Sequence, residues 1–429
     1  MKILILGSGG REHTIAWKFG QSSLCEKLYI APGNAGTAGI AENLNLDILD
    51  FDSLKHEVLY RAIDFVVVGP EAPLVEGVVD YFQRDGELRH IPILGPDRVA
   101  AQLEGSKSYA KSFMHRHGIP TAGYFEVTSD NLPEGMDYLS GLEGPYVLKA
   151  DGLAAGKGVL IIEDLEEAKL ELRAMIEGKF GHASRKVVIE EFLDGIEFSV
   201  FVLTDGQQYV LLPEAKDYKR VGVGDTGLNT GGMGSVSPVS FFEGAFRDKV
   251  IQRIVEPTID GIRQDGLHYS GFVFFGLIKV GEEPFVIEYN CRMGDPETQS
   301  VLPRIEDDLL EMSYKAATQN LDSRTLNLTP ETACSVVVVA EGYPGTYRKG
   351  DAIEGLDQED VLIFHAGTSV VDSRVVTNGG RVLAITALDI EPEKATQKAL
   401  AGAKKVQCEA GIYFRTDIGQ DLLKLKGAQ

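Results

Sequence analysis

Three polar side chains with the spacing for metal and phosphate chemistry occur together near residue 290. The segment Phe285–Gln299 reads FVIEYNCRMGDPETQ, an apolar strand that ends in Glu288, Asn290 and Arg292. Side chains two residues apart in a strand point to the same face, so these three would project together. Carboxylate and amide oxygens suit Mg²⁺, which usually binds with phosphates, and a neighbouring Arg can hold a carboxylate or phosphate bidentately. The alternative is an edge strand with a solvated Glu followed by a turn, and the segment alone leaves both open.

A glycine-rich segment could bind phosphates. Asp151–Gly158 (DGLAAGKG) follows Lys149 directly and lies between two apolar strands. The backbone N–H groups of such a loop can close over phosphates, and the flanking lysines can neutralise a transferred phosphoryl group. No helix follows and no Ser or Thr comes after Lys157, so this is not a Walker loop. The alternative is a flexible hairpin without a ligand, but the lysines on both sides of the glycines favour phosphate binding.

Two further stretches have polar groups at places where ligands bind. Ile189–Glu197 (IEEFLDGIE) ends an apolar strand in paired acids, one of which could receive the ribose hydroxyls of adenosine. Its alternative is an exposed acidic turn. The segment Pro213–Arg220 is followed by the glycine-dense Gly227–Gly234, which is long enough to fold over a substrate. Its alternative is a loop without fixed structure.

The N-terminal glycines resemble half of a dinucleotide fingerprint. In Gly7–Glu12 (GSGGRE) the third glycine position holds Glu12, and the second strand ends at Ala31-Pro32 rather than in an acid. NAD binding is therefore disfavoured. A helix that begins after glycines still offers an anion site for one phosphate. We expect His13 to pack or cap rather than to catalyse.

Residues 1–103 have the pattern of a doubly wound parallel sheet. Short strands that each stop in a glycine or proline loop before a helix are typical of βαβ units, which bind ligands at the carboxyl ends of the strands. The expected strands are Lys2–Leu6, Leu28–Ala31, Phe65–Val68 and Ile93–Leu94.

Beyond this N-terminal domain we expect two more units, at 104–327 and 328–429. The middle one begins with a helical stretch from Gln102 to Gly118 and contains a mobile lobe at about 122–190, with a solvated helix over Asp164–Gly178. Its antiparallel hairpins are Phe198–Thr204 with Tyr209–Leu212, and Gly271–Val280 with Pro284–Tyr289. The last unit is a mixed α/β unit with expected strands Cys334–Ala340, Val361–Ala366, Ser369–Val376 and Arg381–Ala387 and a helix Pro392–Cys408.

Composition indicates a globular protein of the cytoplasm. A chain of 429 residues is too long for one core, and its 44% hydrophobic and 25% charged residues are ordinary. A net charge of −22 without a basic stripe argues against nucleic acid. The first apolar run is too short for a signal peptide or membrane span, so no membrane partner is expected. Four scattered cysteines fit a reducing compartment, and we place Cys291 on the face opposite Glu288.

In this order the motifs resemble the ATP-grasp ligases, and within them the phosphoribosylamine–glycine ligase family. The resemblance extends over essentially the whole chain. It is carried by GSGGREH (7–13), PGNAGT (32–37), VVVGPEAPLVEGVVD (66–80), QLEGSK (102–107), LKADGLAAGKGV (148–159), PEAKDYKR (213–220), NTGGMG (229–234), EYNCRMGDPETQ (288–299), GYPGTYRKGD (342–351) and HAGT (365–368). Ten motifs in register are far more specific than any one of them.

The resemblance implies a central ATP-grasp domain and a reaction. ATP, glycine and 5-phosphoribosylamine would give glycinamide ribonucleotide, ADP and phosphate with Mg²⁺ or Mn²⁺, an early step of purine synthesis, in a protein that we expect to be a monomer. Glu288 and Asn290 would bind the metal. The nucleotide would be bound by Lys107, Lys149, Gly152, Gly156, Lys157 and Gly158 on the phosphate side and by Glu190, Glu191 and Glu197 on the adenosine side. Substrate contacts are expected at Gly9, Gly10, Asn34, Gly36, Thr37 and Glu71, while Arg292, Asp217 and Lys149 would act on the reacting groups.

Departures from the family pattern affect single positions. The chain has Gly222-Val-Gly-Asp225 where the family usually has Gly-Asp-Gly-Asp, and Leu228 where it has Pro. The absent acid at Val223 bears on that loop position and not on the reaction class. Two alternatives remain: an ATP-grasp ligase that uses bicarbonate in place of glycine, and a nucleotide-binding regulatory protein.

Overall fold

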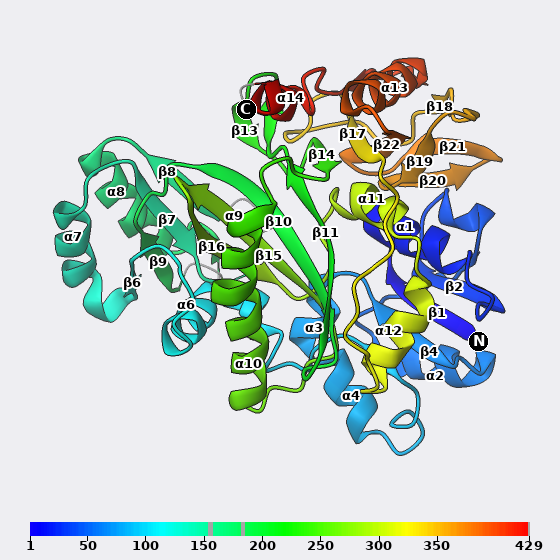
Figure 1. Ribbon diagram of the computed structural model, residues 1–429, viewed down its shortest axis with the longest axis horizontal. Coiled ribbons are helices and arrows are strands. Elements are labelled where there is room, and N and C mark those ends of the chain that lie inside the picture. The colour runs from blue at the N-terminus through cyan, green and yellow to red at the C-terminus, as the bar shows by residue number, and fades with distance from the viewer. Residues whose placement is uncertain (153–157, 182–184, 428–429) are drawn as a thin grey trace.

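A computed structural model describes residues 1–152, 158–181 and 185–427 and contains three large sheets (Figure 1). The predicted phosphate residues Gly156 and Lys157 lie outside the described residues. The sheets are a parallel five-stranded one, an antiparallel four-stranded one and an antiparallel nine-stranded one. The multidomain α/β and α+β class expected from the sequence is confirmed.

The N-terminal sheet is doubly wound, as predicted. Its strand order is β3-β2-β1-β4-β5, and all its pairs are parallel. Strand β1 is apolar at Ile3 to Leu6 because helices cover both faces of the sheet. The elements are β1 (Lys2–Gly7), α1 (Gly10–Phe19), β2 (Lys27–Pro32), β3 (Glu42–Asn43), α2 (Phe51–Arg61), β4 (Phe65–Val68), α3 (Glu71–Glu76), α4 (Val78–Arg84) and β5 (Ile93–Leu94).

The four-stranded sheet forms a separate lobe, at the left of Figure 1, with its own core. The strand order is β6-β9-β7-β8, and two helices cover one side. Buried Ala168, Leu172 and Met175 recur at helical spacing, so the charged segment predicted as a solvated helix is amphipathic and packs on this sheet. The elements are β6 (Tyr124–Val127), α7 (Leu132–Gly141), β7 (Tyr146–Ala150), β8 (Val159–Ile162), α8 (Leu165–Ile176) and β9 (Val187–Glu190).

The nine-stranded sheet joins the middle of the chain to its C-terminal part. Its order is β16-β15-β10-β11-β14-β17-β22-β19, with β24 also paired to β17. Both hairpins predicted in the middle unit are confirmed; Gly206 turns between β10 and β11 with φ +85°. The strands are β10 (Ile196–Thr204), β11 (Tyr209–Asp217), β14 (Gly234–Ser237), β15 (Gly271–Val280), β16 (Glu283–Asn290), β17 (Thr332–Ala340), β19 (Leu362–His365), β22 (Arg381–Asp389) and β24 (Ile412–Tyr413).

Helices and small hairpins surround this sheet. The helices are α5 (Gln102–Gly105), α6 (Lys107–Arg116), α9 (Gly244–Val250), α10 (Glu256–Gln264), α11 (Thr298–Val301), α12 (Leu309–Ala317), α13 (Pro392–Lys405) and α14 (Gln420–Gly427), with a π-helical turn at Ile251–Val255. The remaining strands are β12 (Arg220–Gly222), β13 (Thr226–Asn229), β18 (Ile353–Glu354), β20 (Thr368–Val371), β21 (Arg374–Thr377) and β23 (Gln407–Cys408).

Three sequence-based element predictions were wrong in detail. The stretch after Gln102 is two helices, because Ser106 is extended (φ −140°) and caps α6 by accepting the Tyr109 N–H. The expected strand Ser369–Val376 is the hairpin β20–β21, turned by positive φ at Asp372 and Ser373. The last helix ends at Lys405, and Gln407–Cys408 is a strand paired with β18.

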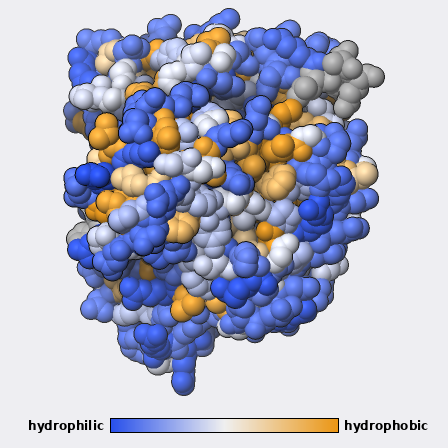
Figure 2. All heavy atoms as spheres, turned by 90° about the vertical axis from the view of Figure 1, so that its left-hand side faces the viewer, coloured by the Kyte–Doolittle hydropathy of each residue, from blue (hydrophilic) through white to orange (hydrophobic). Residues whose placement is uncertain are grey.

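None of the helices among the described residues combines the length and apolar character that a membrane crossing requires. Figure 2 shows the lobe side of the molecule, where hydrophilic side chains predominate and apolar ones are scattered among them. Single exposed apolar residues such as Leu170 are normal on a soluble surface.

Candidate active site

A bulge in the β15–β16 pair reverses the face that the strand buries, so that Glu288 and Asn290 no longer share the buried face of Val286. The pairing shifts between Gly276 and Leu277, so that Gly276 lies opposite Glu288 and Leu277 opposite Val286. After this shift Tyr289 is buried, whereas Glu288 and Asn290 are half-buried. A Cβ at Gly276 would lie 3.1 Å from Glu288 Cγ, so the glycine leaves room for that side chain. The strand ends at Asn290, and the predicted pair of oxygen ligands therefore lies at the strand end.

Arg292 lies just past this strand and is surrounded by carboxylates. Its Nη2 is 2.7 Å from Glu104 Oε1, its Nε is 3.4 Å from Glu71 Oε2, and Nη2 also lies 3.4 Å from Asn290 Oδ1. Burial opposes the charge, but Glu104 and Glu71 keep the pKa of Arg292 above its usual value. Burial raises the pKa of Glu104 despite the guanidinium beside it. Arg292 thus links α3 and α5 to the end of β16.

The start of the glycine-rich segment is anchored at the N-terminus of α6. Ser106 Oγ donates to the Asp151 carboxylate at 3.0 Å, and the Ser108 N–H donates to it at 2.7 Å. Lys107 Nζ lies 3.5 Å from the Gly152 carbonyl. Burial lowers the pKa of Lys107, while the neighbouring Glu288 carboxylate opposes the shift. Lys107 therefore lies near both Gly152 and Glu288, while Gly158 is buried at the other end of the segment.

The predicted adenosine-side acids occupy two environments. Glu190 ends β9 in the interior, where its Oε2 pairs with Lys149 and with Lys111, both at 3.0 Å. Glu191 is exposed and accepts the Gly123 N–H at 3.1 Å. Glu197 starts the next strand and pairs with Lys219 at 2.6 Å. All three lie on the passage from the lobe into the nine-stranded sheet.

Asp217, at the end of β11, belongs to a charged cluster with Lys219, Glu197 and Glu297. Burial raises the pKa of Asp217, and Glu197 adds to the shift while Lys219 opposes it. Burial, with the Asp217 charge adding to it, also raises the pKa of Glu297 to about 8. A buried carboxylate whose pKa is raised by burial and by a neighbouring carboxylate is common at sites that transfer protons.

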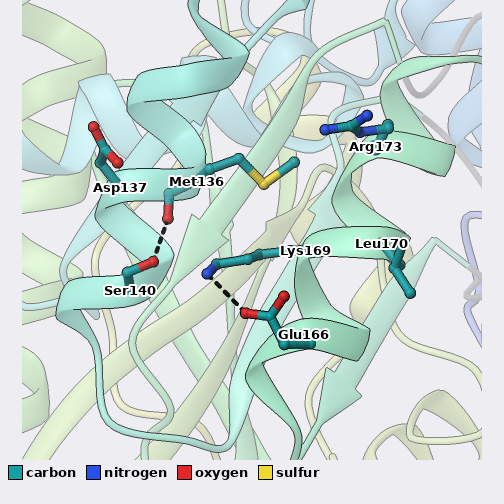
Figure 3. A pocket seen from close by; sticks show the side chains of 7 residues that line it. All are labelled: Met136, Asp137, Ser140, Glu166, Lys169, Leu170 and Arg173. Carbon is teal, nitrogen blue, oxygen red and sulfur yellow. Dashed lines mark hydrogen bonds and ion pairs between the residues drawn. The ribbon is translucent and has the colours of Figure 1, made fainter.

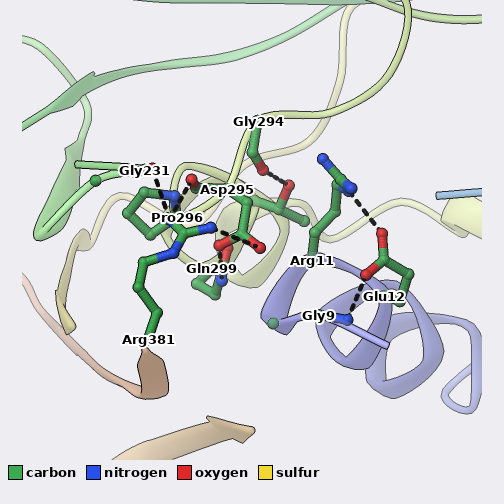
Figure 4. Close-up of polar contacts among 12 residues, drawn as sticks. Gly9, Arg11, Glu12, Gly231, Gly294, Asp295, Pro296, Gln299 and Arg381 are labelled. Atoms are coloured by element: carbon green, nitrogen blue, oxygen red, sulfur yellow. Dashed lines mark hydrogen bonds and ion pairs between the residues drawn. The ribbon is translucent and has the colours of Figure 1, made fainter. Parts of the chain in front are cut away.

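The N-terminal glycines meet the segment after Arg292 and the C-terminal part of the chain (Figure 4). The Gly9 N–H donates to Glu12 Oε2 at 2.6 Å, so the chain's own carboxylate occupies part of the anion site expected at the start of α1. A Cβ at Gly10 would lie 2.4 Å from Gln299 Nε2. Against the effect of burial, Arg11 lowers the pKa of Asp295 in this region and also that of Glu71, which Arg292 lowers too. The two arginines therefore share Glu71 as a neighbour.

Asp295 is held between arginines from two parts of the chain. Arg381 on β22 donates to the carbonyls of Asp295 and Gly231, both at 2.6 Å, and its Nη2 lies 3.4 Å from Asp295 Oδ2. Burial opposes ionisation, but Arg381 and Arg11 hold the pKa of Asp295 below its usual range. The N-terminal, central and C-terminal parts of the chain thus all contribute to one cluster.

Asn34, Gly36 and Thr37 shape a loop beside this cluster. Asn34 Oδ1 accepts the N–H groups of Gly36 and Thr37, and its Nδ2 donates to the carbonyls of Ser8 and His365. Thr37 Oγ1 accepts the Asn34 N–H. These side-chain groups are committed to the loop, so contact with a substrate would come from its backbone.

Histidines 13 and 365 pack against the same loop. The His365 N–H donates to His13 Nδ1 at 2.8 Å, and a Cβ at Gly36 would collide with both rings. Burial, with His365 adding to it, lowers the pKa of His13 to about 3, and burial lowers that of His365 to about 4. The prediction that His13 packs rather than catalyses agrees with this environment.

Sequence reasoning missed several charged residues of the site and one amide, Gln299. They are Arg11, Glu12, Glu104, Lys111, Lys219, Asp295, Glu297, Gln299 and Arg381. Some stand inside motifs that were recognised, but charged residues on helices and loops give no periodic signal of their own. Cys291 lies just past the end of β16, so the expected strand face does not apply to it, but it is buried in the core and burial raises the pKa of its thiol.

A groove on the outer side of the lobe is separate from the candidate active site. It measures about 330 Å³ and is lined by α7 and α8 (Figure 3). The lining residues are Met136, Asp137, Ser140, Glu166, Lys169, Leu170 and Arg173, which include none of the predicted site residues.

The donors at the end of β16 fit a metal that shares its ligands with phosphates. Among the described residues, no group of three or more His, Cys, Asp and Glu side chains could hold a metal ion. Glu288 and Asn290 offer hard oxygen donors close to Lys107, and Mg²⁺ commonly binds through one or two such groups plus phosphate oxygens.

Comparisons with known proteins identify the family of this chain. The chain matches the models of the phosphoribosylglycinamide synthetase N domain (residues 1–104), ATP-grasp (A) domain (105–298) and C domain (333–421). It is 45% identical over 426 residues to phosphoribosylamine–glycine ligase of Vibrio parahaemolyticus, covering 98% of each chain.

Solved structures agree with these matches. The crystal structure of phosphoribosylamine–glycine ligase from Thermotoga maritima superposes with a TM-score of 0.83 at 35% identity, covering 98% of this chain and 100% of the other. The biotin carboxylase domain of Hydrogenobacter thermophilus 2-oxoglutarate carboxylase, in complex with MgADP and bicarbonate, superposes with a TM-score of 0.72. It is 15% identical, covering 98% of this chain and 97% of the other, and so shares the fold alone. The chain belongs to the phosphoribosylglycinamide synthetase family, the phosphoribosylamine–glycine ligases of the ATP-grasp superfamily.

Proposed function

We propose that this chain uses the cluster at the end of β16 to join glycine to 5-phosphoribosylamine, giving glycinamide ribonucleotide, ADP and phosphate in purine biosynthesis. One observation carries the proposal: Glu288 lies close enough to Lys107 and Arg292 to act on the charge of both. Arg292 and Arg11, which follows the N-terminal glycines, both act on Glu71, so the glycine loop borders the same cluster. The 45% identity to a ligase of this name over 98% of both chains supports the substrates. The bicarbonate-using alternative rests on relatives that share only the fold.

The reaction needs an activated carboxylate. Glycine does not accept an amine directly, because its leaving group would be oxide. An oxygen of the glycine carboxylate attacks the γ-phosphorus of ATP, the bond to ADP breaks, and glycyl phosphate forms. The nitrogen of phosphoribosylamine then attacks the glycyl carbonyl, the C–O bond to phosphate breaks, and the nitrogen loses a proton.

The nucleotide phosphates lie against Lys107, Lys149 and the glycine-rich segment, whose positive charge stabilises the transferring phosphoryl group. Glu288 and Asn290 would hold Mg²⁺ or Mn²⁺, which would supply positive charge against the phosphates. Glu190, Glu191 and Glu197 line the adenosine side.

Arg292, held by Glu104 and Glu71, is aimed at the reacting carboxylate or phosphate. Asp217 accepts the proton that the attacking amine releases. Burial raises the pKa of Asp217 and that of Glu297, which favours the uptake of a proton by this pair.

The domain assignment and cellular context are part of the proposal. The domains are 1–103, 104–327 and 328–429, and the lobe at about 122–190 closes to keep water from the acyl phosphate. The protein works as a cytoplasmic monomer without a nucleic-acid or membrane partner, which fits the net charge of −22 and the four free cysteines.

An ADP-formation assay tests the proposal directly. The purified chain is given ATP, Mg²⁺ and phosphoribosylamine with either glycine or bicarbonate. The proposal expects ADP and glycinamide ribonucleotide only with glycine. ADP formation that depends on bicarbonate and not on glycine would contradict the proposal and support an ATP-grasp ligase that uses bicarbonate.

A further inference from the structure

The lobe is joined to the rest of the molecule by two chain segments that are bonded to each other. Residues 118–123 lead into β6, and residues 190–196 lead out of β9. The Glu191 N–H donates to the Gly123 carbonyl at 2.9 Å, and the Gly123 N–H donates to Glu191 Oε2 at 3.1 Å. A movement of the lobe therefore has to move both segments together.

Lys111 contacts both segments from outside the lobe. It lies on α6, whose Phe113 and Met114 belong to the main core of the molecule. Lys111 Nζ donates to Thr121 Oγ1 at 2.8 Å and to the Ala122 carbonyl at 3.3 Å. The same Nζ is 3.0 Å from Glu190 Oε2, with a Lys111 side-chain exposure of 2%.

Glu190 shares that oxygen between two lysines of different parts of the chain. Lys149, on β7 of the lobe beside the glycine-rich segment, also lies 3.0 Å from Glu190 Oε2. The other oxygen, Oε1, is buried and has no hydrogen-bond partner among the described residues. One carboxylate thus serves two cations, and it keeps a partner if one of them leaves.

The first segment also reaches β16, the strand that carries Glu288. Thr121 Oγ1 donates to the Val286 carbonyl at 2.7 Å, and the Val286 N–H donates to the Pro120 carbonyl at 2.8 Å. Val286 precedes Glu288 by two residues on β16. Lys111 therefore lies at a junction between α6, both lobe segments and the strand of the proposed metal ligands.

We propose that Lys111 is a positioning residue that holds the Glu190 carboxylate when Lys149 turns to the nucleotide phosphates, and so couples nucleotide binding to the lobe segments. The inference rests on the proposed function in one respect, since it takes Lys149 as a phosphate-binding residue. Lys111 itself touches no substrate in this role.

The physical reason lies in the cost of an unpaired buried charge. With Lys111 present, Lys149 can leave Glu190 without leaving the carboxylate unpaired. Without Lys111, Lys149 is the cation that remains paired with Glu190. When Lys149 turns to a phosphate, the buried Glu190 carboxylate then loses its counter-charge. Nucleotide binding should then be weaker, because the cost of leaving Glu190 unpaired is subtracted from the free energy of binding.

Equilibrium titration with MgADP tests the proposal on the full chain. We expect Lys111→Met to raise the dissociation constant for ADP about tenfold or more, while Lys111→Arg, which keeps the charge, stays within about threefold of wild type. Lys18→Met is the matched control, because Lys18 is also a buried lysine, 8% exposed, but it lies on α1 and donates to the Ile305 carbonyl. This control should bind ADP like wild type. Equal ADP binding by wild type and Lys111→Met, or equal weakening in Lys111→Met and Lys18→Met, would overturn the proposal.

A second variant covers the case in which Lys111→Met does not fold. Thr121→Val keeps the shape of the side chain and removes the hydroxyl between Lys111 and Val286. In hydrogen exchange, ADP should protect residues 118–123 and 190–196 in wild type, and this protection should fall at least about twofold in Thr121→Val. Unchanged protection contradicts the coupling. The ADP experiments need no glycine, so normal ADP binding without glycinamide ribonucleotide formation would refute the proposed function separately.

Discussion

Replacing Arg292 with Met should destabilise the fold in a pH-dependent way. The substitution leaves Glu104 without the guanidinium 2.7 Å away, in a site where that carboxylate side chain is 5% exposed. Removing one partner of a buried ion pair costs about 3–5 kcal/mol. In the variant, Glu104 keeps the hydrogen bond from the Cys291 N–H, at 2.8 Å, but no longer has the guanidinium.

The pH dependence follows from the protonation of Glu104. Burial already raises its pKa, and loss of Arg292 raises it further. A carboxyl with a raised folded-state pKa binds more protons folded than unfolded, so its cost is largest at high pH and falls as the pH is lowered. Between the unfolded-state pKa of the carboxyl and its raised folded-state pKa, each unit by which the pH is lowered restores up to about 1.4 kcal/mol of the free energy of unfolding. The penalty of Arg292→Met should therefore be clearly smaller at pH 6 than at pH 8.

Urea unfolding at pH 6 and pH 8 measures this difference, with the slope m checked for each variant. The double variant Arg292→Met with Glu104→Gln is the control, because the amide removes the charge that lost its partner. It should regain much of the stability at pH 8. An equal penalty at both pH values, with no recovery in the double variant, would refute the account of this pair.

Three further predictions concern the metal, the histidines and a loop. Glu288→Ala should lower metal-dependent ADP formation about 100-fold or more, since a metal contributes several kcal/mol, with the urea midpoint unchanged; full activity would contradict the metal assignment. His13 has a folded-state pKa of about 3, below its usual 6.5, so its stability contribution is complete above about pH 6.5 and falls by up to about 1.4 kcal/mol per pH unit as the pH is lowered. His13→Asn, which keeps an acceptor for the His365 N–H, should flatten the Tm profile between pH 6.5 and 4.5, and parallel profiles would count against this. Arg415 is 1% exposed; it donates to the Arg220 carbonyl at 3.0 Å and pairs with Asp417 at 2.7 Å, whose side chain is 18% exposed. Arg415→Met leaves these groups without their partner, so it should cost about 1–3 kcal/mol and open residues 221–229 to limited proteolysis, whereas a wild-type cleavage pattern would refute the tether.

The sequence predicted the parts of the fold whose signals are local. Strands such as β1 and β4 are continuous apolar runs that end in glycine loops, and the β10–β11 hairpin has Asp205-Gly206 at its turn. What local patterns could not show is the pairing of β14 with β17, which carries one sheet across the middle and C-terminal units. Such pairing depends on residues about one hundred positions apart.

The site was predictable in its residue types but not in its partners. The alternation of Glu288 and Asn290 suggested a common face, but the sequence did not show the bulge near Gly276 that turns this face away from the buried side of Val286. Arg292 was expected to meet substrate, but nothing in the sequence linked it to Glu104. That Asn34 and Thr37 contact substrate stays a prediction; the sequence did not show that their side chains bind the loop itself and that Asn34 also binds the carbonyls of Ser8 and His365. Contacts of this kind depend on tertiary packing.

The central claim is that glycine is activated as an acyl phosphate, and isotope transfer tests it most directly. Glycine labelled with ¹⁸O in its carboxylate is converted with ATP and phosphoribosylamine, and the phosphate formed is examined by mass spectrometry. If a glycine oxygen attacks the γ-phosphorus, each phosphate carries one oxygen from glycine. Phosphate without label, formed together with glycinamide ribonucleotide, would contradict the mechanism.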